Sequence, residues 1–456
     1  MKTVTTAQMR QLDARTIAAG TPGAVLMERA GRAVAEQAGK FLRQHNAREV
    51  LLLAGKGNNG GDAIVAAKFL ADAGFAPTLV THDQLAGKLP ATPLIVDGLL
   101  GTGLTGEVRE PYRSAIEFIN NSRSFVIAID VPSGLGTGIC VRADVTVTFG
   151  LPKIDLLKPA AADFVGRLEV ADIGLLVADV TSDVELITRA DIVVPERKRS
   201  AHKGAFGHLL IIAGAEGYTG APVLCAHAAA RSGVGLITLA VPREIYGIVA
   251  GNCPPEVMPV PLDKLPALET FNALAIGPGL GRAPVTEKFV RDLLARTTMP
   301  AVVDADALST VAWRPGLVLT PHPGEMARLT GKTTQEVQAN RWEMARQFAR
   351  EKNVTLALKG AGTVVTDATG KLWINMTGNP GMAKGGMGDA LTGIIGALLA
   401  QGLPALEAAK AGVFLHGRAG DLAAQRVGEP AMLATDLIAA LGAAFSTGCV
   451  TNFVRP

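Results

Sequence analysis

Short apolar segments that lead into a glycine-rich or acidic loop, and then into a helix pattern, recur along the chain. In the first half the apolar runs predict buried parallel strands over Val50–Ala54, Thr78–Val80, Leu94–Asp97, Phe125–Asp130 and Val145–Phe149. The helix patterns between them cover Pro22–Leu42, Ile64–Gly74 and Pro111–Asn121. Alternation of this kind predicts a doubly wound, Rossmann-like α/β sheet, which binds ligands at the carboxyl ends of its strands.

The second half shows the same alternation of strand and helix patterns, but its sequence does not repeat that of the first half. Its predicted strands are His208–Ala213, Leu236–Ala240, Leu274–Ile276, Ala301–Asp304, Val318–Leu319 and Thr355–Lys359. Its clearest helix patterns are Thr334–Glu351, Ala390–Gln401 and Ala405–Gln425. We expect a second and larger α/β sandwich.

A chain of 456 residues is too long for one ordinary core, so two or three domains are expected. The stretch Val194–Lys203 is polar and basic after its first residue and predicts a linker or domain entry. We place the boundary slightly upstream, which gives domains 1–183 and 184–456. A basic tail for nucleic acid is the alternative, but a run this short is more often a solvated surface.

Charge, hydropathy and cysteine spacing exclude several classes of protein. The formal net charge is only +3, so no strong field for nucleic acid is expected. The first 20 residues lack the apolar core of a signal peptide, and no run of 18 apolar residues predicts a membrane span. The four cysteines are scattered without metal-ligand spacing, which favours a reduced, cytoplasmic setting without structural zinc. A homo-oligomer is compatible with this composition.

The run Gly378–Asp389 carries the strongest chemical signal of the chain. It places five glycines before one aspartate, and the helix pattern of Ala390–Gln401 follows directly. Glycine lets backbone N–H groups converge on an anion, and the helix N-terminus adds partial positive charge. An anion nest with a carboxylate at its rim suits phosphoryl transfer to a hydroxyl group. The alternative is a glycine-rich hinge with a capping aspartate.

Three loops of the first half also follow predicted strands. These loops are Gly55–Asp62, Asp97–Gly106 and Asp130–Gly134. Because the carboxyl ends of parallel strands share one edge of the sheet, the loops are expected to line one cleft. Each acid could instead cap a loop or a helix, and Asp62 in particular stands where a helix cap would.

In this order and spacing, GNNGGD, GTGLTG and DVPSG resemble the NAD(P)H-hydrate epimerase domain over roughly residues 1–180. The resemblance implies that a hydrated dinucleotide contacts Asn58, Asn59, Gly60, Gly61 and Asp62. It implies a phosphate cradle at Gly101, Thr102, Gly103, Leu104, Thr105, Gly106 and Glu107. It further implies potassium ligands at Asn59, Asp97 and Ser133, with Asp130 at the nicotinamide ring. Ala63 stands where the family usually has glycine.

In the second half, KGAFGH, GYTGA, GPGLG, DADAL, TPHPGE and KGAGT precede the glycine run. Together these motifs resemble the ADP-dependent NAD(P)H-hydrate dehydratase, which has a ribokinase-like fold, from Lys203 to the C-terminal helices. The resemblance implies that the dinucleotide meets Ala221, Gly279, His322 and Asp389. It implies that ADP, assisted by Mg²⁺, meets Lys359, Gly360, Ala361, Gly362, Thr363 and Gly388. Asp304 and Glu325 are candidate helpers around the metal, and Lys384 stands where the family often has threonine.

These resemblances predict a two-domain enzyme that repairs damaged nicotinamide cofactors. The first domain would interconvert the R and S forms of hydrated NADH and NADPH, with Asp130 moving the proton. The second would dehydrate the S form, with Asp389 as base and ADP as phosphoryl donor, giving AMP and phosphate. The alternatives are a ribokinase-like kinase of small molecules and a first domain that only binds a ligand.

Overall fold

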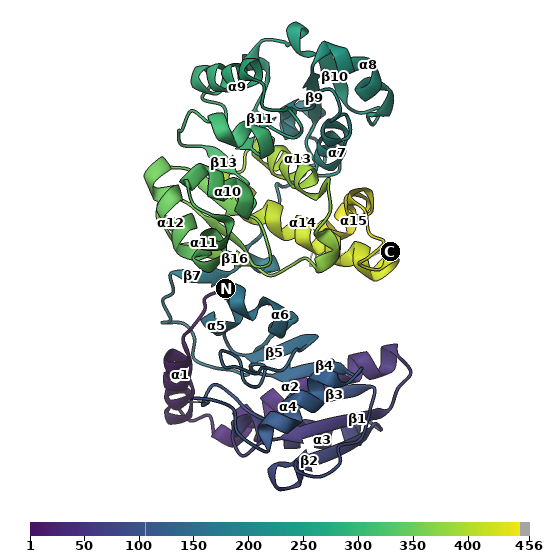
Figure 1. Cartoon of the computed structure of the whole chain (residues 1–456), viewed down its shortest axis with the longest axis vertical. Helices are drawn as coiled ribbons and strands as arrows, with labels where there is room; N and C mark the ends of the chain where they lie inside the picture. The colour runs from purple at the N-terminus through teal and green to yellow at the C-terminus, as the bar shows by residue number, and fades with distance from the viewer. Residues whose placement is uncertain (105, 447–456) are drawn as a thin grey trace. The chain divides into compact units, whose positions relative to one another are not determined.

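The computed structural model describes residues 1–104 and 106–446, and the chain divides into two compact units. The first unit is Met1–Leu186 and the second begins at Ile187. Figure 1 draws the first unit in purple and blue and the second in teal, green and yellow. Each unit has its own hydrophobic core. No helix in the described part of the chain is long and apolar enough to cross a membrane.

The first unit is a parallel sheet with helices on both faces. Its strands are β1 (Glu49–Ala54), β2 (Ala76–Thr81), β3 (Leu94–Gly98), β4 (Phe125–Ile129), β5 (Val145–Phe149) and β6 (Arg167–Ala171), and β7 (Val184–Leu186) ends the unit. Its helices are α1 (Thr6–Ala18), α2 (Gly23–Gln44), α3 (Asn58–Asp72), α4 (Tyr112–Asn121), α5 (Ile154–Leu157) and α6 (Ala162–Val165). The strand order is β2-β1-β3-β4-β5-β6, and each neighbouring pair in this order is parallel.

Alternate residues of these strands are buried on opposite faces. Val50 and Leu52 of β1 pack in the cluster that includes α1, α2 and α3. Leu51 and Leu53 pack with α4 on the other face. Burial on both sides explains why the strands are continuous apolar runs, as parallel sheets require. The predicted Rossmann-like, doubly wound fold of this half is confirmed.

The second unit has a longer sheet that is parallel except at one end. Its strands are β8 (His208–Ile212), β9 (Leu236–Val241), β10 (Met258–Pro261), β11 (Ala273–Ile276), β12 (Ala301–Val303), β13 (Leu317–Leu319), β14 (Thr355–Leu358), β15 (Thr363–Thr366) and β16 (Leu372–Asn375). They run in the order β10-β9-β8-β11-β12-β13-β14-β15-β16. The pairs β14–β15 and β15–β16 are antiparallel.

The helices of the second unit cover its sheet. They are α7 (Gly220–Ala230), α8 (Arg243–Asn252), α9 (Pro284–Arg296), α10 (Pro323–Thr330), α11 (Thr334–Ala339), α12 (Arg341–Lys352), α13 (Met387–Ala400), α14 (Ala405–Val427) and α15 (Ala434–Ser446). Helices α13 and α14 lie side by side (Figure 1) and share one core with α7 and α15. Nearly every residue of α13 is buried, which explains its strongly apolar sequence.

Two predicted helices differ from the structure. The predicted helix Thr334–Glu351 is two helices, because the chain bends at Asn340 (φ −128°, ψ 34°) between α11 and α12. The predicted helix Ile64–Gly74 begins six residues earlier, at Asn58. Glycine is a poor helix former, but here close packing outweighs that preference. A β-carbon at Gly60 would lie 1.9 Å from the carbonyl oxygen of Gly55.

Candidate active sites

The carboxyl ends of β1 and β3 mark the point where the first sheet changes direction. These strands are neighbours, and β2 lies on the outer side of β1. The connections that follow two such strands leave in opposite directions and open a crevice between them. The segments that follow β1, β3 and β4 are the three loops that the sequence singled out.

Asn59 ties these three strand ends together. It lies buried in the first turn of α3. Its Nδ2 donates to Ile129 O at the end of β4 (2.6 Å) and to Leu100 O after β3 (3.4 Å). A β-carbon at Gly101 would lie 2.5 Å from Asn59 Oδ1. The asparagine amide and the start of the predicted phosphate cradle are therefore in direct contact.

Asp97 and Ser133 form a second buried link at the same edge. Ser133 Oγ donates to Asp97 Oδ1 (2.6 Å), and Ser133 N donates to Asp97 Oδ2 (2.9 Å). Leu100 N donates to Ser133 Oγ (2.8 Å). Asp97 is fully buried, and burial raises its pKa to about 6 although the bonds from Ser133 act in the opposite direction. Among the described residues no lysine or arginine pairs with it.

The three predicted potassium ligands are thus gathered in one cluster of oxygen atoms. Asn59, Asp97 and Ser133 present an amide, a carboxylate and a hydroxyl, and carbonyl groups lie between them. Hard cations prefer oxygen ligands of these kinds. A buried carboxylate without a cationic partner is costly, by several kcal/mol in typical cases. The donor set and the uncompensated charge of Asp97 both fit a bound cation.

The alternative that Asp62 only caps a helix is wrong. The N-cap of α3 is Gly57 and makes no side-chain cap, so Asp62 stands in the second turn and is buried there. Burial raises the pKa of Asp62 to about 8, and the nearby Asp130 adds to the effect while Lys153 opposes it. A carboxyl group with this pKa carries its proton at neutral pH and can donate it.

Asp130 lies immediately after β4 with a left-handed backbone (φ 65°). Such a conformation costs a non-glycine residue roughly 1–2 kcal/mol, and residues held this way cluster at functional sites. Its carboxylate forms an ion pair with Lys153, whose side chain is 2% exposed. Lys153 was not among the residues predicted from the sequence, because a single lysine after Leu151-Pro152 does not form a recognisable motif.

The predicted phosphate cradle is partly exposed. Leu104 N donates to Gly101 O (3.4 Å), which curls the loop, and Arg10 Nη2 of α1 donates to Thr102 O (3.1 Å). Arg10 adds a positive charge beside the cradle that no motif indicated. Glu107 lies beside Gly138, where a β-carbon would meet its carboxylate at 3.1 Å. Thr105 lies outside the described residues.

Ala221 and Gly279 meet at the corresponding point of the second sheet. β8 lies between β9 and β11, so the loops that follow β8 and β11 flank the change of direction. A β-carbon at Gly279 (φ 63°) would lie 2.9 Å from Tyr218 Cβ and 3.1 Å from Ala221 Cβ. Only glycine fits this close approach, which brings two of the predicted dinucleotide contacts together.

Asp389 lies in the first turn of α13, directly after the glycine run. Gly386 is the N-cap residue and has a left-handed backbone (φ 89°). The first amide groups of a helix have no partner within it, so they remain available to an anion. Burial raises the pKa of Asp389 to about 6, and the carboxylate of Asp304 contributes in the same direction.

Lys359 connects this helix start with two other elements. Its Nζ lies 2.8 Å from Asp304 Oδ1 and 3.8 Å from Glu325 Oε2. Thr392 Oγ1 of α13 donates to Asp304 Oδ2 (2.8 Å). A β-carbon at Gly388 would lie 3.3 Å from Lys359 Nζ. Burial alone would lower the pKa of Lys359. The nearby carboxylates of Asp304 and Glu325 outweigh this effect, so the pKa of Lys359 is raised and its ammonium group stays charged.

This network uses both acids that were expected near a metal. Asp304 and Glu325 face Lys359, and His322 lies beside Glu325 with 3.4 Å between Nε2 and Oε1. His322 caps α10, because its Nδ1 accepts from Gly324 N (3.0 Å) and Glu325 N (3.3 Å). Burial lowers the pKa of His322, and its Nδ1 acts as an acceptor, so the ring is neutral.

The predicted nucleotide loop is the tight turn between β14 and β15. It comprises Gly360, Ala361, Gly362 and Thr363, all partly or fully exposed. Thr363 Oγ1 donates to Gly360 O (2.9 Å), which closes the turn. The buried Arg341 supports it from α12 by donating to Lys359 O (3.1 Å).

Lys384 does not extend into the anion nest. Its Nζ donates to Met432 O (2.9 Å) and to Pro430 O, so it anchors the segment before α15. Asp421 of α14 holds the start of the glycine run, since Gly378 N and Asn379 Nδ2 each donate to its carboxylate at 3.1 Å. Neighbouring elements thus hold the glycine run at its start and at Lys384 in its middle.

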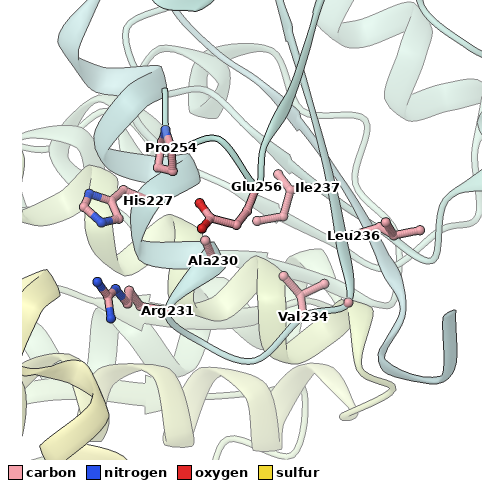
Figure 2. A pocket seen from close by; sticks show the side chains of 9 residues that line it. His227, Ala230, Arg231, Val234, Leu236, Ile237, Pro254 and Glu256 are labelled. Carbon is pink, nitrogen blue, oxygen red and sulfur yellow. The ribbon is translucent and has the colours of Figure 1, made fainter. Parts of the chain in front are cut away.

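A pocket of about 390 Å³ in the second unit is separate from this site. Figure 2 shows it with the side chains of His227, Arg231 and Glu256 around it. Leu236, the first residue of β9, lines it. It therefore lies at the amino end of the sheet, whereas Asp304 and Lys359 follow strand ends at the carboxyl edge.

The two sites define a class: an enzyme with two α/β units, each bearing a buried aspartate, Asp97 or Asp304, at the carboxyl edge of its sheet. A family model described as NAD(P)H-hydrate dehydratase matches residues 209–442. A second model, the YjeF-related protein N-terminus, matches residues 23–91 and 81–154. A bifunctional NAD(P)H-hydrate repair enzyme of Moorella thermoacetica is 41% identical over 96% of this chain and 95% of its own length. The chain belongs to the family of bifunctional NAD(P)H-hydrate repair enzymes.

Solved structures resemble the second unit. An ADP/ATP-dependent NAD(P)H-hydrate dehydratase from Bacillus subtilis, crystallised with ATP and Mg²⁺, is 31% identical with a TM-score of 0.55 and covers 59% of this chain and 99% of its own. A ribokinase-like protein from Enterococcus faecalis is 27% identical with a TM-score of 0.54 and covers 59% of this chain and 97% of its own. The predicted ribokinase-like fold of the second half is confirmed.

Proposed function

We propose that the chain repairs hydrated NADH and NADPH in two steps, one in each unit. The first unit interconverts the R and S hydrates, and the second dehydrates the S form with ADP as phosphoryl donor. The observation that carries the proposal is the second site: Asp389 at an open helix N-terminus, beside the charged ammonium of Lys359. Family membership supplies the substrate class.

In the second unit, the Asp389 carboxylate takes the proton from the substrate hydroxyl. The hydroxyl oxygen then forms a bond to the terminal phosphorus of ADP, and AMP leaves. The carbon–oxygen bond of the new phosphate ester then breaks, phosphate leaves with the electron pair of that bond, and loss of a proton from the adjacent ring carbon restores NAD(P)H. The amide groups before Asp389 and the Lys359 ammonium are placed to stabilise the transferring phosphoryl group.

We assign the ligands of this reaction to the loops around that helix start. The hydrated dinucleotide contacts Ala221, Gly279 and His322, and the adenine nucleotide contacts Gly388 and the turn Gly360–Thr363. Mg²⁺ supplies charge neutralisation at the phosphates when bound, as it does in phosphoryl transfer generally. Nucleotide and Mg²⁺ in the Bacillus subtilis dehydratase crystals support the assignment.

In the first unit, the two aspartates divide the proton chemistry. Asp62, whose pKa is about 8, gives its proton to the hydroxyl, and the carbon–oxygen bond breaks as water leaves. Water adds to the other face of the same carbon and passes a proton to Asp130. A proton then returns from Asp130 to Asp62, which restores the starting state. Potassium at Asn59, Asp97 and Ser133 would neutralise buried charge and order the strand ends.

One experiment tests both steps. The purified chain is given hydrated NADPH of mixed epimers with ADP or ATP, and recovery of reduced-nicotinamide absorbance is followed. Full recovery supports both activities. Recovery of only the S fraction would refute the epimerase activity of the first unit. A stable phosphorylated product without NADPH would indicate that the second unit is a kinase instead. No recovery with either nucleotide would refute the proposed function.

A further inference from the structure

Lys153 is among the most deeply buried charged residues of the first unit. It directly precedes α5, and its side chain is 2% exposed. A lysine is almost never fully buried unless its charge is paired, because desolvation of an ammonium costs several kcal/mol. Its partner is Asp130, the aspartate that we assign to the epimerase reaction. The pair therefore needs an explanation beyond packing.

The ammonium group of Lys153 has acceptors for all three of its hydrogens. It donates to Asp130 Oδ1, to Thr148 Oγ1 (3.1 Å) and to Phe149 O (3.3 Å). A lysine side chain has three donors and no acceptor. No donor is left for a substrate, so Lys153 does not hydrogen-bond the substrate, and its direct contact with the proposed catalytic groups is the one with Asp130.

The two oxygens of Asp130 have different surroundings. Oδ1 accepts from Lys153 Nζ, from Thr148 Oγ1 (3.1 Å) and from Phe149 N (3.3 Å). In the described part of the chain no donor reaches Oδ2. The Asp130 side chain is 13% exposed, so a small part of it remains open to a ligand. One oxygen is thus occupied by the protein, and the other is free.

We propose that Lys153 is a positioning residue of the epimerase site. Together with Thr148 and the Phe149 amide it holds Oδ1 of Asp130 and leaves Oδ2 as the atom that accepts the proton. This inference rests on the proposed epimerase function. The left-handed backbone of Asp130 supports it, because a strained residue persists only where its surroundings fix it.

The neighbouring charges make the lysine necessary. Asp13 of α1 and Asp62 of α3 lie close enough to Asp130 and Lys153 to interact electrostatically with both. Burial raises the pKa of Asp13 as well as that of Asp62. The cluster therefore holds one buried carboxyl group, that of Asp62, two partly buried ones, those of Asp13 and Asp130, and one cation. Without the cation, a like-charge cluster favours protonation of its members. The Lys153 ammonium, which contacts Asp130 Oδ1, opposes this repulsion between like charges.

The test uses the whole chain with Lys153→Met, Thr148→Val and, as matched control, Lys158→Met. Lys158 lies five residues further on in an exposed ion pair with Asp155 (2.6 Å). Conversion of the isolated R hydrate to the S hydrate is followed by chromatography across pH. Dehydration of the S hydrate with ADP is measured on the same samples. Thermal melting reports whether each variant is folded.

We expect Lys153→Met to lower kcat of epimerisation about 100-fold with little change in KM, because the ammonium does not touch substrate. The alkaline limb of its pH profile should move up, because the Lys153 ammonium acts to lower the pKa of Asp62 in the unmodified chain. Thr148→Val removes one donor to Oδ1 and should lower kcat by up to about tenfold. Lys158→Met should match the unmodified chain, and dehydration should be unaffected in all three.

An unchanged pH profile and kcat in folded Lys153→Met would overturn the inference, as would a raised KM with normal kcat. If Lys153→Met fails to fold, Thr148→Val decides, because it keeps the ion pair and the side-chain volume. Wild-type kcat in that variant would then refute the inference. Failure of the proposed epimerase function would look different from failure of this inference, because the unmodified chain would then not interconvert the hydrates at all.

Discussion

At the residue scale, the pKa of Asp389 sets the lower pH limit of dehydration. A base must be unprotonated, and burial with the Asp304 carboxylate raises this pKa to about 6. The dehydratase kcat/KM should therefore fall as pH drops below about 6 and level off above it. Initial rates with the S hydrate and ADP test this.

Asp389→Asn should lower the rate of dehydration about 10³-fold or more at every pH, while epimerisation by the same sample continues. Dehydration at the normal rate in this variant would exclude Asp389 as the base.

The raised pKa of Asp62 predicts that the epimerase rate falls on the alkaline side of its pH profile, whereas the dehydratase rate falls on the acid side. A general acid must hold its proton, so epimerisation should decline as pH rises above about 8. Asp62→Asn should lower the rate about 10²-fold and remove the alkaline limb. The dehydratase rate of the same sample is the control. A wild-type alkaline limb in the variant would assign that limb to another group.

Several candidate site residues could be predicted from sequence because each stands in a short motif at a strand end. Asn59, Asp97 and Ser133 come from three separate motifs, and hydrogen bonds bring them together. Lys153 and Thr392 could not be found in this way. Each contacts an aspartate that lies outside its own motif in the sequence, and a single lysine or threonine carries no local pattern.

At the element scale, the start of α13 depends on the conformation of one glycine. A β-carbon at Gly386 would lie 2.6 Å from Leu224 Cδ1, and its φ of 89° disfavours any other residue. Gly386→Ala should destabilise the second unit by about 1–2 kcal/mol and abolish most dehydratase activity, because the nest amides would shift. The neighbouring Gly385 has open space, so Gly385→Ala is the matched control and should be nearly neutral. Equal melting temperatures and activities for both variants would contradict this geometry.

The oxygen cluster that joins β1, β3 and β4 gives a second prediction at this scale. A cation bound only to the folded state stabilises it in proportion to its affinity. Replacing potassium chloride by tetramethylammonium chloride at constant ionic strength should lower the first melting transition by several degrees and reduce epimerisation. Asp97→Asn should remove the difference between the two salts. If Asp97→Asn shows the same difference in melting temperature between the two salts, the potassium effect does not arise at this oxygen cluster.

Element boundaries were predicted less well than element types. The start of α3 was missed because two glycines weaken the local helix signal, and only contact with Gly55 explains the earlier start. The break at Asn340 was missed because apolar residues continue through it. The antiparallel strands β15 and β16 are four residues each and too short for a clear alternation.

At the scale of the whole molecule, each described site is built from residues of one unit. The two activities should therefore separate by mutation. Given only the R hydrate with ADP, neither Asp130→Asn nor Asp389→Asn should recover NADPH beyond the spontaneous rate. A mixture of the two variants should recover it, because the S hydrate formed by one can diffuse to the other. Absence of recovery in the mixture would show that the epimer does not pass between chains.

The sequence by itself determined the two α/β folds, the strand-end motifs and the place of the anion nest. These follow from local rules: apolar periodicity, glycine-rich turns and helix starts depend on neighbouring residues. The tertiary structure alone decided which acids hold protons and which side chains fix them. Burial raises the pKa of Asp62, the Lys153 ammonium occupies one oxygen of Asp130, and Lys359 sits beside Gly388. Desolvation and ion pairing depend on segments that are distant in sequence, so no local pattern records them.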